Sequence, residues 1–317
     1  MSQGFQLSFR AALVSFMIAF AGTTANADTI GSIFLTGHDP DYHAFAGGNA
    51  AGAAAINKDA INFVTDPGFN TFASAGVKKF LFVTSSIAPP SGHVDGTNGL
   101  LASGYALGTD FDRADAATLV TALGQLGTTY DAIVIGSDLG GILTQAELDI
   151  LNTHSTDIIN FLNSGGGLYA MAESDSGAGL TSGGLFGYLP FVVSSTAKEQ
   201  NEAGYTVTPF GASIGLSSAD INGNASHNIF TATSGLNIVD LDSSGSIISL
   251  AGRGQVTNGG VSAIPEPSDI FLFATGLFAF YGVGRVLKSI KSDPIDFRSK
   301  SRAPWVASVR VRKRSEP

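Results

Sequence analysis

The chain of 317 residues contains no cysteine. Disulfide bonds are therefore excluded in whatever compartment the protein folds, and catalysis by a thiol nucleophile is excluded with them. The folded part must be stabilised by an ordinary hydrophobic core. Roughly 235 residues lie between the two ends described below, which is enough for one large domain or two small ones to bury such a core.

Basic residues are scarce over most of the chain. From Thr29 to Ala263 there are 6 basic and 20 acidic residues, a balance of −14. This excludes nucleic acid as a partner, because its recognition requires a basic surface. The acidic balance is compatible with cation binding or with solubility alone. From Arg285 to Pro317 there are 10 basic and 3 acidic residues. We expect residues 292–317 to be a disordered basic tail on the cytoplasmic side, near anionic lipid.

The amino-terminal end has the pattern of a secretory signal peptide. A single cation, Arg10, precedes an apolar stretch from Ala11 to Ala21, and Ala25-Asn26-Ala27 is typical of a cleavage site. We therefore predict that residues 1–27 direct the chain to the Sec translocon and are removed by signal peptidase. They are not expected to be part of the fold.

A three-part segment lies near the other end. It consists of Pro265-Glu266-Pro267, an apolar run from Ile270 to Gly284, and the cations Arg285, Lys288 and Lys291. The run is somewhat shorter than the ~20 residues that span a bilayer comfortably, but its aromatic residues give it strong membrane affinity. It predicts a C-terminal transmembrane helix with the cations on the cytoplasmic side. The alternative is a buried helix of the globular domain, which would not normally lie between Pro-x-Pro and a cationic tail.

This three-part segment resembles the PEP-CTERM sorting signal of Gram-negative bacteria that secrete exopolysaccharide. The resemblance implies that Pro265, Glu266 and Pro267 are recognised by an exosortase-type membrane processing enzyme, with residues 263–291 as the sorting signal. It also implies export to the cell surface or extracellular matrix and an association with exopolysaccharide or biofilm. Members of the family usually end soon after the basic cluster, whereas this chain continues to Pro317.

The body, residues 28–253 followed by an expected linker at 254–262, alternates predicted strands and helices. Thr144 and Glu147 form a capping box at the start of one helix. The predicted strands are Thr29–Thr36, Lys79–Thr84, Ala132–Ile135 and Gly167–Ala172, and the predicted helices are Ala44–Val64, Asp115–Leu126 and Thr144 to about Asn163. Further strands, some of them antiparallel, are expected at Phe191–Ser194, Tyr205–Pro209, Asn237–Leu241 and Ile247–Leu250. This alternation predicts an α/β fold with a mainly parallel sheet.

The order YDAIVIGSD, LTQAELDILN and INFLNSGGGLYAMAES, over Asp131–Ser174, resembles the core of class I glutamine-amidotransferase-like domains, including the ThuA-like branch. The resemblance implies a flavodoxin-like three-layer sandwich. In catalytic members, the turn after the strand that follows the glycines presents a cysteine nucleophile. Here that turn is Ala172-Glu173-Ser174-Asp175. The resemblance therefore implies the fold without glutamine amidotransfer.

The densest polar cluster follows the first predicted strand. In a parallel sheet this is the carboxyl edge, where ligands bind. Imidazole and carboxylate groups together suit a divalent metal. The candidate ligands are His38, Asp39, Asp41 and His43, which His93, Asp95, Asp138 and Glu173 would join from the other strand ends. The alternative is that Asp-Pro-Asp forms a turn whose side chains cap backbone groups, with both flanking histidines solvated.

Other patterns carry less chemistry. Ser137 lies in a sequence that resembles G-x-S-x-G only superficially, and Ser174 lacks the preceding glycine of a nucleophile elbow. Gly165-Gly166-Gly167 favours a tight helix-to-strand turn over a phosphate-binding loop, because the lysine of a P-loop is missing. We interpret His154, in a predicted helix, and His227, in a polar loop, as structural or solvated.

Three functional hypotheses follow. The first is an exported surface protein whose amidotransferase-like domain is non-catalytic and binds a ligand or the extracellular matrix. The second is a metal-dependent hydrolase acting on carbohydrate through His38, Asp39, Asp41 and His43. The third is a matrix protein without a specific ligand. A divalent metal is the cofactor that the second hypothesis requires.

Overall fold

The computed structural model describes most of the chain between residues 30 and 262, within the first of two compact units, 1–264 and 265–317. The described residues are 30–85, 94–138, 140, 142–174, 180–181, 184–198 and 203–262. The predicted signal peptide, the Pro-Glu-Pro motif, the apolar run and the basic tail lie outside them. Within these ranges, none of the helices has the length and hydrophobicity that a membrane span requires.

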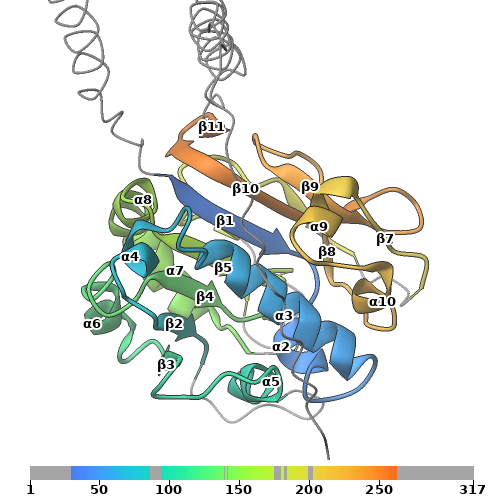
Figure 1. The fold of residues 1–317 in the computed structure, drawn as a ribbon, viewed down its shortest axis with the longest axis horizontal. Helices are drawn as coiled ribbons and strands as arrows, with labels where there is room; N and C mark the ends of the chain where they lie inside the picture. Colours follow the sequence, from blue (N-terminus) through green and yellow to red (C-terminus); the bar gives the residue numbers. More distant parts are fainter. Residues whose placement is uncertain are drawn as a thin grey trace, which may run out of the picture. The chain divides into compact units, whose positions relative to one another are not determined.

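A mixed sheet organises the described unit (Figure 1), and the described residues contribute 11 strands to it. One half of the sheet is parallel, in the order β3-β2-β4-β5-β1. Its strands are β1 (Gly31–Thr36), β2 (Phe80–Val83), β3 (Phe111–Ala114), β4 (Ala132–Ile135) and β5 (Gly167–Ala170). Strands buried on both faces are continuous apolar runs, so the sequence predicted all of these except β3. The half-buried charged residues Asp112 and Arg113 interrupt the apolar pattern of β3.

The other half of the sheet is antiparallel and begins where β10 pairs with β1. Its strands are β6 (Ser195–Ala197), β7 (Thr206–Val207), β8 (Asn228–Phe230), β9 (Asn237–Leu241), β10 (Ile247–Thr257) and β11 (Gly260–Ser262). The expectation of a linker at 254–262 is wrong, because β10 and β11 form a hairpin there. Val256 and Val261 face each other in this hairpin and are buried, so these residues belong to the fold.

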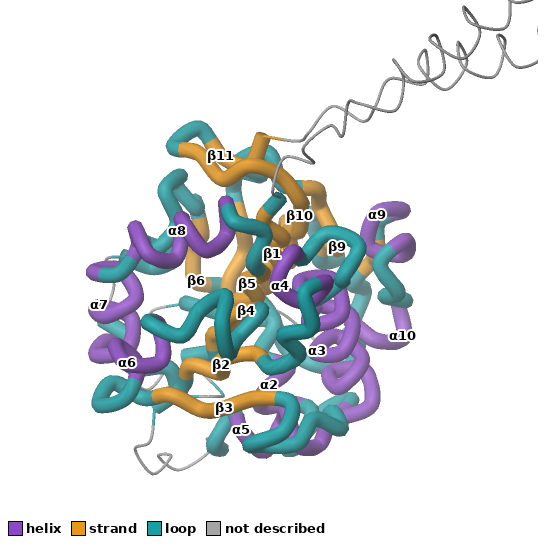
Figure 2. Tube along the Cα trace, turned by 60° about the vertical axis from the view of Figure 1, so that its left-hand side comes forward, coloured by secondary structure: helices purple, strands orange, loops and turns teal. Residues whose placement is uncertain are grey.

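Helices cover both faces of the sheet, and Figure 2 shows the sheet nearly edge-on between them. One face carries α6, α7 and α8, and the other carries α3, α9 and α10. The helices are α2 (Pro40–His43), α3 (Ala50–Val64), α4 (Thr71–Ser74), α5 (Thr97–Ala102), α6 (Leu119–Leu123), α7 (Gln145–Thr153), α8 (Ser155–Asn163), α9 (Pro209–Ser213) and α10 (Ser218–Ile221). The described unit is therefore an α/β fold compatible with three layers.

The start of one helix differs from prediction for a local reason. The helix expected from Ala44 begins later, because Gly47 and Gly48 adopt φ values of 77° and 57°, and α3 begins only after Asn49. The Asn49 side chain caps α3 by accepting a hydrogen bond from the Gly52 amide at 3.0 Å. The predicted capping box of Thr144 and Glu147 is confirmed at the start of α7.

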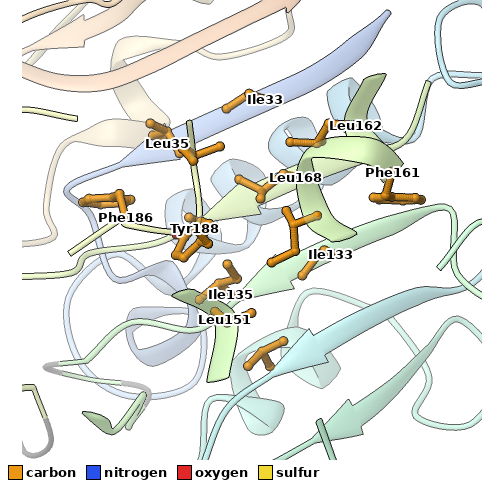
Figure 3. Close-up of a cluster of buried hydrophobic side chains, with 14 of the residues drawn as sticks. Ile33, Leu35, Ile133, Ile135, Leu151, Phe161, Leu162, Leu168, Phe186 and Tyr188 are labelled. Carbon is orange, nitrogen blue, oxygen red and sulfur yellow. The ribbon is translucent and has the colours of Figure 1, made fainter. Parts of the chain in front are cut away.

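The apolar side chains form a core on each face of the sheet. Alternation along β1 sends Ile33 and Leu35 to one core and Phe34 to the other. In the first core, Leu151 of α7 and Leu162 of α8 pack against the sheet (Figure 3). Full burial of each such side chain stabilises the fold by about 1.5–3 kcal/mol. The cores fix the strand ends from which the polar residues emerge.

A buried asparagine of α3 holds α2 in place. Asn57 Nδ2 donates to the Pro40 carbonyl oxygen at 3.0 Å and to Ser103 Oγ at 3.1 Å. The Tyr169 hydroxyl donates to Asn57 Oδ1 at 3.2 Å. A buried amide is tolerated when its polar atoms are paired, and here the pairing joins α2, the end of α5 and β5 to α3.

Strand pairing continues beyond β1 and brings a distant segment to its carboxyl end. The Gly37 amide donates to the Ile248 carbonyl oxygen and the His227 amide donates to the Gly37 carbonyl oxygen, both at 2.7 Å. His38 and Ser226 then form an antiparallel bridge. The backbones approach so closely that a Cβ on Gly37 would lie 2.0 Å from the Asn228 carbonyl oxygen.

We expect the substitution Gly37→Ala to lower the free energy of unfolding by on the order of 1–3 kcal/mol, because the added methyl group must push these two segments apart. Gly259→Ala is the matched control, since the nearest atom to its new Cβ, Thr257 Oγ1, is 3.8 Å away. Urea denaturation of both variants measures the effect. Equal stability of the two would show that the close approach at Gly37 does not constrain the fold.

Candidate functional site at the carboxyl edge

Polar residues gather where β1, β4 and β5 end. These strands are parallel neighbours, so the residues that follow them emerge at one edge of the sheet. The gathered side chains are buried: His38 is 1 % exposed, Asp39 2 % and His227 6 %. The alternative of a turn flanked by solvated histidines does not fit this burial. The structure therefore places this polar cluster at the carboxyl edge of the sheet, where the sequence predicted it.

Asp39 lies between two imidazoles. Its Oδ1 is 3.3 Å from Nε2 of His43, four residues later, and its Oδ2 is 3.3 Å from Nε2 of His227. On another side, the backbone of Gly140 approaches so closely that a Cβ there would lie 2.5 Å from Asp39 Oδ2. Imidazole nitrogen and carboxylate oxygen are common ligands of divalent metals. Asp39, His43 and His227 are therefore the described residues whose geometry would suit a metal.

Asp41 points to a different partner. Its Oδ1 accepts a hydrogen bond from Ser137 Oγ at 2.7 Å, and its Oδ2 accepts one from the Ser137 amide at 2.9 Å. Burial raises the pKa of Asp41 to about 7, against the opposing effect of these hydrogen bonds. Asp41 thus joins α2 to the loop after β4 and takes no part in the group around Asp39.

His38 also departs from the predicted cluster. Its Nε2 lies 2.8 Å from Asp240 Oδ2, and its ring packs edge-on against Tyr205. Successive side chains of an extended chain point to opposite faces, so His38 and Asp39 diverge. The set of His38, Asp39, Asp41 and His43 proposed for a hydrolase is therefore not brought together.

Glu173 follows β5, and its carboxyl group contacts Phe186 and Tyr188, two residues of the core labelled in Figure 3. Its Oε2 accepts a hydrogen bond from the Phe186 amide at 2.6 Å, and its Oε1 accepts one from the Tyr188 hydroxyl. Burial raises the pKa of Glu173 to about 8. Its role in the described structure is to hold the segment around residues 186–188, apart from the group around Asp39.

Of two other predicted contributors, one lies outside the described residues and the other has a different partner. His93 lies outside the described residues. Asp95 forms an ion pair with Arg113 of β3, with 2.5 Å between Oδ2 and Nη1. Its carboxylate therefore binds β3, at the edge of the sheet.

The serine residues at this edge donate to carboxylates. Ser137 Oγ donates to Asp41, and Ser174 Oγ donates to Asp138 Oδ1 at 3.0 Å. A serine nucleophile is normally activated by an imidazole that accepts its proton. The hydrogen bonds of these two hydroxyls thus favour a structural role for both.

His227 is the residue whose contact with Asp39 the sequence analysis missed. It lies just before β8, and its backbone is held by Gly37 on one side and by Lys198, whose amide donates to its carbonyl oxygen at 2.9 Å. No spacing relative to Asp39 signals this contact, because the two residues are 188 positions apart in the sequence.

Comparisons of the chain with protein-family models, with curated proteins and with solved structures found no match. The resemblances to PEP-CTERM proteins and to amidotransferase-like domains accordingly stay predictions from the sequence. The site is described by its geometry alone.

Replacing Glu173 should change how stability depends on pH. In the unfolded chain its carboxyl group loses its proton near pH 4.5, whereas the folded protein keeps that proton to about pH 8. The folded state binds more protons in this window, so the contribution to stability is full below pH 4.5 and is lost as the pH rises toward 8. Glu173→Gln removes this titration, and the variant should gain on the order of 1–3 kcal/mol relative to wild type across the window.

Urea denaturation at about pH 5.5 and about pH 8 measures this gain. Burial also raises the pKa values of Asp41 and Asp131 to about 7, but these groups remain in both proteins and cancel in the difference. Asp149→Asn, at an exposed position of α7, is the control. A stability difference between wild type and Glu173→Gln that stays constant with pH would contradict the prediction.

Proposed function

We propose that this protein is exported, sorted by an exosortase-type enzyme and displayed on the cell surface or in the extracellular matrix. Its α/β domain is non-catalytic and binds a ligand at the carboxyl edge of the sheet. The observation that carries the binding role is the convergence of Asp39, His43 and His227 at that edge. Burying polar groups from distant parts of the chain costs free energy, and a matrix protein without a specific ligand would gain nothing in return.

The non-catalytic assignment has two supports. The chain contains no cysteine, so the thiol chemistry of catalytic amidotransferase-like domains has no nucleophile. The hydroxyls of Ser137 and Ser174 donate to aspartates, which favours structural roles for them.

The strand order supports the finer, flavodoxin-like assignment. Strands β3, β2, β4 and β5 occupy the positions of 2-1-3-4 in the flavodoxin-like order 2-1-3-4-5. The first strand of this chain, β1, takes the place of the fifth. In open α/β sheets, ligands bind outside the carboxyl ends of the strands, which agrees with a ligand site at this edge.

Export and sorting rest on the two ends of the sequence. The signal-peptide pattern of residues 1–27 predicts translocation, and Pro265-Glu266-Pro267 with the apolar run after it predicts processing at the membrane. The resemblance to exosortase substrates associates the protein with exopolysaccharide.

The test is localisation of the full-length chain in an exopolysaccharide-producing Gram-negative host that encodes an exosortase. We expect the protein in the surface and extracellular fractions, shortened at both ends. A variant with Pro265→Ala and Pro267→Ala should be translocated but stay in the membrane fraction at its unprocessed length. Pro294→Ala, outside the motif, is the matched control and should behave as wild type. Uncut protein in the cytosolic fraction would overturn the proposal.

A further inference from the structure

We infer that Asp39, His43 and His227 form a binding site for one divalent transition-metal ion of the Zn²⁺ type. This inference rests on the proposed ligand site at the carboxyl edge and names the ligand that the site takes. It replaces the metal site predicted from His38, Asp39, Asp41 and His43, of which the structure brings together only Asp39 and His43.

The separations between the side chains suit metal ligands. With metal–nitrogen bonds of about 2.0–2.1 Å and metal–oxygen bonds of about 2.0–2.2 Å, two ligand atoms at a tetrahedral angle lie about 3.4 Å apart. Nε2 of His43 and Nε2 of His227 each lie 3.3 Å from an oxygen of Asp39. One ligand atom from each of the three residues lies within 4.8 Å of the other two, so the ligand atoms must close in by up to about 1.4 Å to reach tetrahedral spacing.

An unpaired atom at the site points to a ligand. Asp39 Oδ1 is buried and has no hydrogen-bond partner. Native proteins pair nearly all buried polar atoms, so each exception requires an explanation. At 3.3 Å, the contact of Asp39 Oδ1 with His43 Nε2 is close but does not form a hydrogen bond. A cation bound between Asp39 Oδ1 and His43 Nε2 would offset the cost of burying the Asp39 carboxylate.

The backbone holds the three residues in place before any ion binds. His43 lies one helical turn after Asp39 in the segment that includes α2, and Asn57 fixes that segment through the Pro40 carbonyl oxygen. His227 is fixed through the hydrogen bond of its amide to Gly37. Ligands that hydrogen bonds hold in this way lose little conformational freedom when they bind.

The donor set selects the class of metal. Two imidazoles favour Zn²⁺, Fe²⁺, Ni²⁺ or Cu²⁺ over Mg²⁺ and Ca²⁺, which prefer oxygen ligands. A single carboxylate with two neutral imidazoles leaves a positive charge on the bound ion. Three protein ligands also leave a coordination position open. That position would accept an oxygen atom of an external ligand, which connects the metal to the proposed binding role.

The experiment uses the full-length chain in detergent, with an affinity tag that contains no histidine. The protein is stripped of metal with a chelator, and Zn²⁺ binding is measured by titration calorimetry. Co²⁺ absorption reports the coordination separately. We expect one ion per chain for wild type. The variants His43→Gln and His227→Gln should each lose at least about 100-fold in Zn²⁺ affinity. Loss of a residue that only hydrogen-bonds to a metal ligand costs up to about 100-fold, and loss of a ligand itself should cost at least as much.

His154→Gln is the matched control, because His154 lies beside an aspartate, Asp157, at 2.8 Å but outside the proposed site. It should bind Zn²⁺ as wild type does. Circular dichroism checks that each variant is folded, and the half-buried His43 provides a test even if the buried His227 cannot be replaced. Absence of stoichiometric binding to wild type, or wild-type affinity in His43→Gln, would overturn the inference.

The proposed metal site and the proposed surface role can be disproved independently of each other. A metal-free protein that still reaches the cell surface would remove the metal site and leave the export and surface role. A protein that binds one Zn²⁺ through these residues but stays uncut in the cytosol would remove the surface role and leave the metal site.

Discussion

The structure depends on the pairing of β1 along both of its edges. β5 binds one edge in parallel and β10 binds the other in antiparallel register, so β1 joins the two halves of the sheet. Its residues are buried throughout. The pairing continues past Thr36 through Gly37 and the His38–Ser226 bridge. Because this extension carries His227 to Asp39, the backbone hydrogen bonds of β1 determine which side chains meet at the carboxyl edge.

Burial decides the electrostatics of that edge. Desolvation disfavours a charged carboxylate unless hydrogen bonds or cations compensate. Asp41 and Glu173 each accept two hydrogen bonds, yet burial still raises the pKa values of both. Asp39 faces two imidazoles and keeps one oxygen without a hydrogen bond. Their hydrogen bonds thus give Asp41 and Glu173 structural roles, whereas Asp39 Oδ1 is buried without a hydrogen bond.

Much of the fold follows from local patterns. The apolar runs of β2, β4 and β5 and the capping box of Thr144 and Glu147 were found where predicted. Two elements that depend on tertiary contacts were not. The charged edge strand β3 has little apolar signal, and the hairpin of β10 and β11, expected as a linker, becomes a strand pair because Val256 and Val261 bury each other.

The sequence by itself determined the α/β alternation, the absence of thiol chemistry and the position of a polar cluster after β1, because periodicity and composition are local properties. The tertiary structure alone decided how that cluster divides. His38 turns to Asp240, Asp41 binds Ser137, and His227 joins Asp39 and His43. These choices depend on the register between segments that lie from 96 to 202 positions apart in the sequence, and local spacing does not encode such a register.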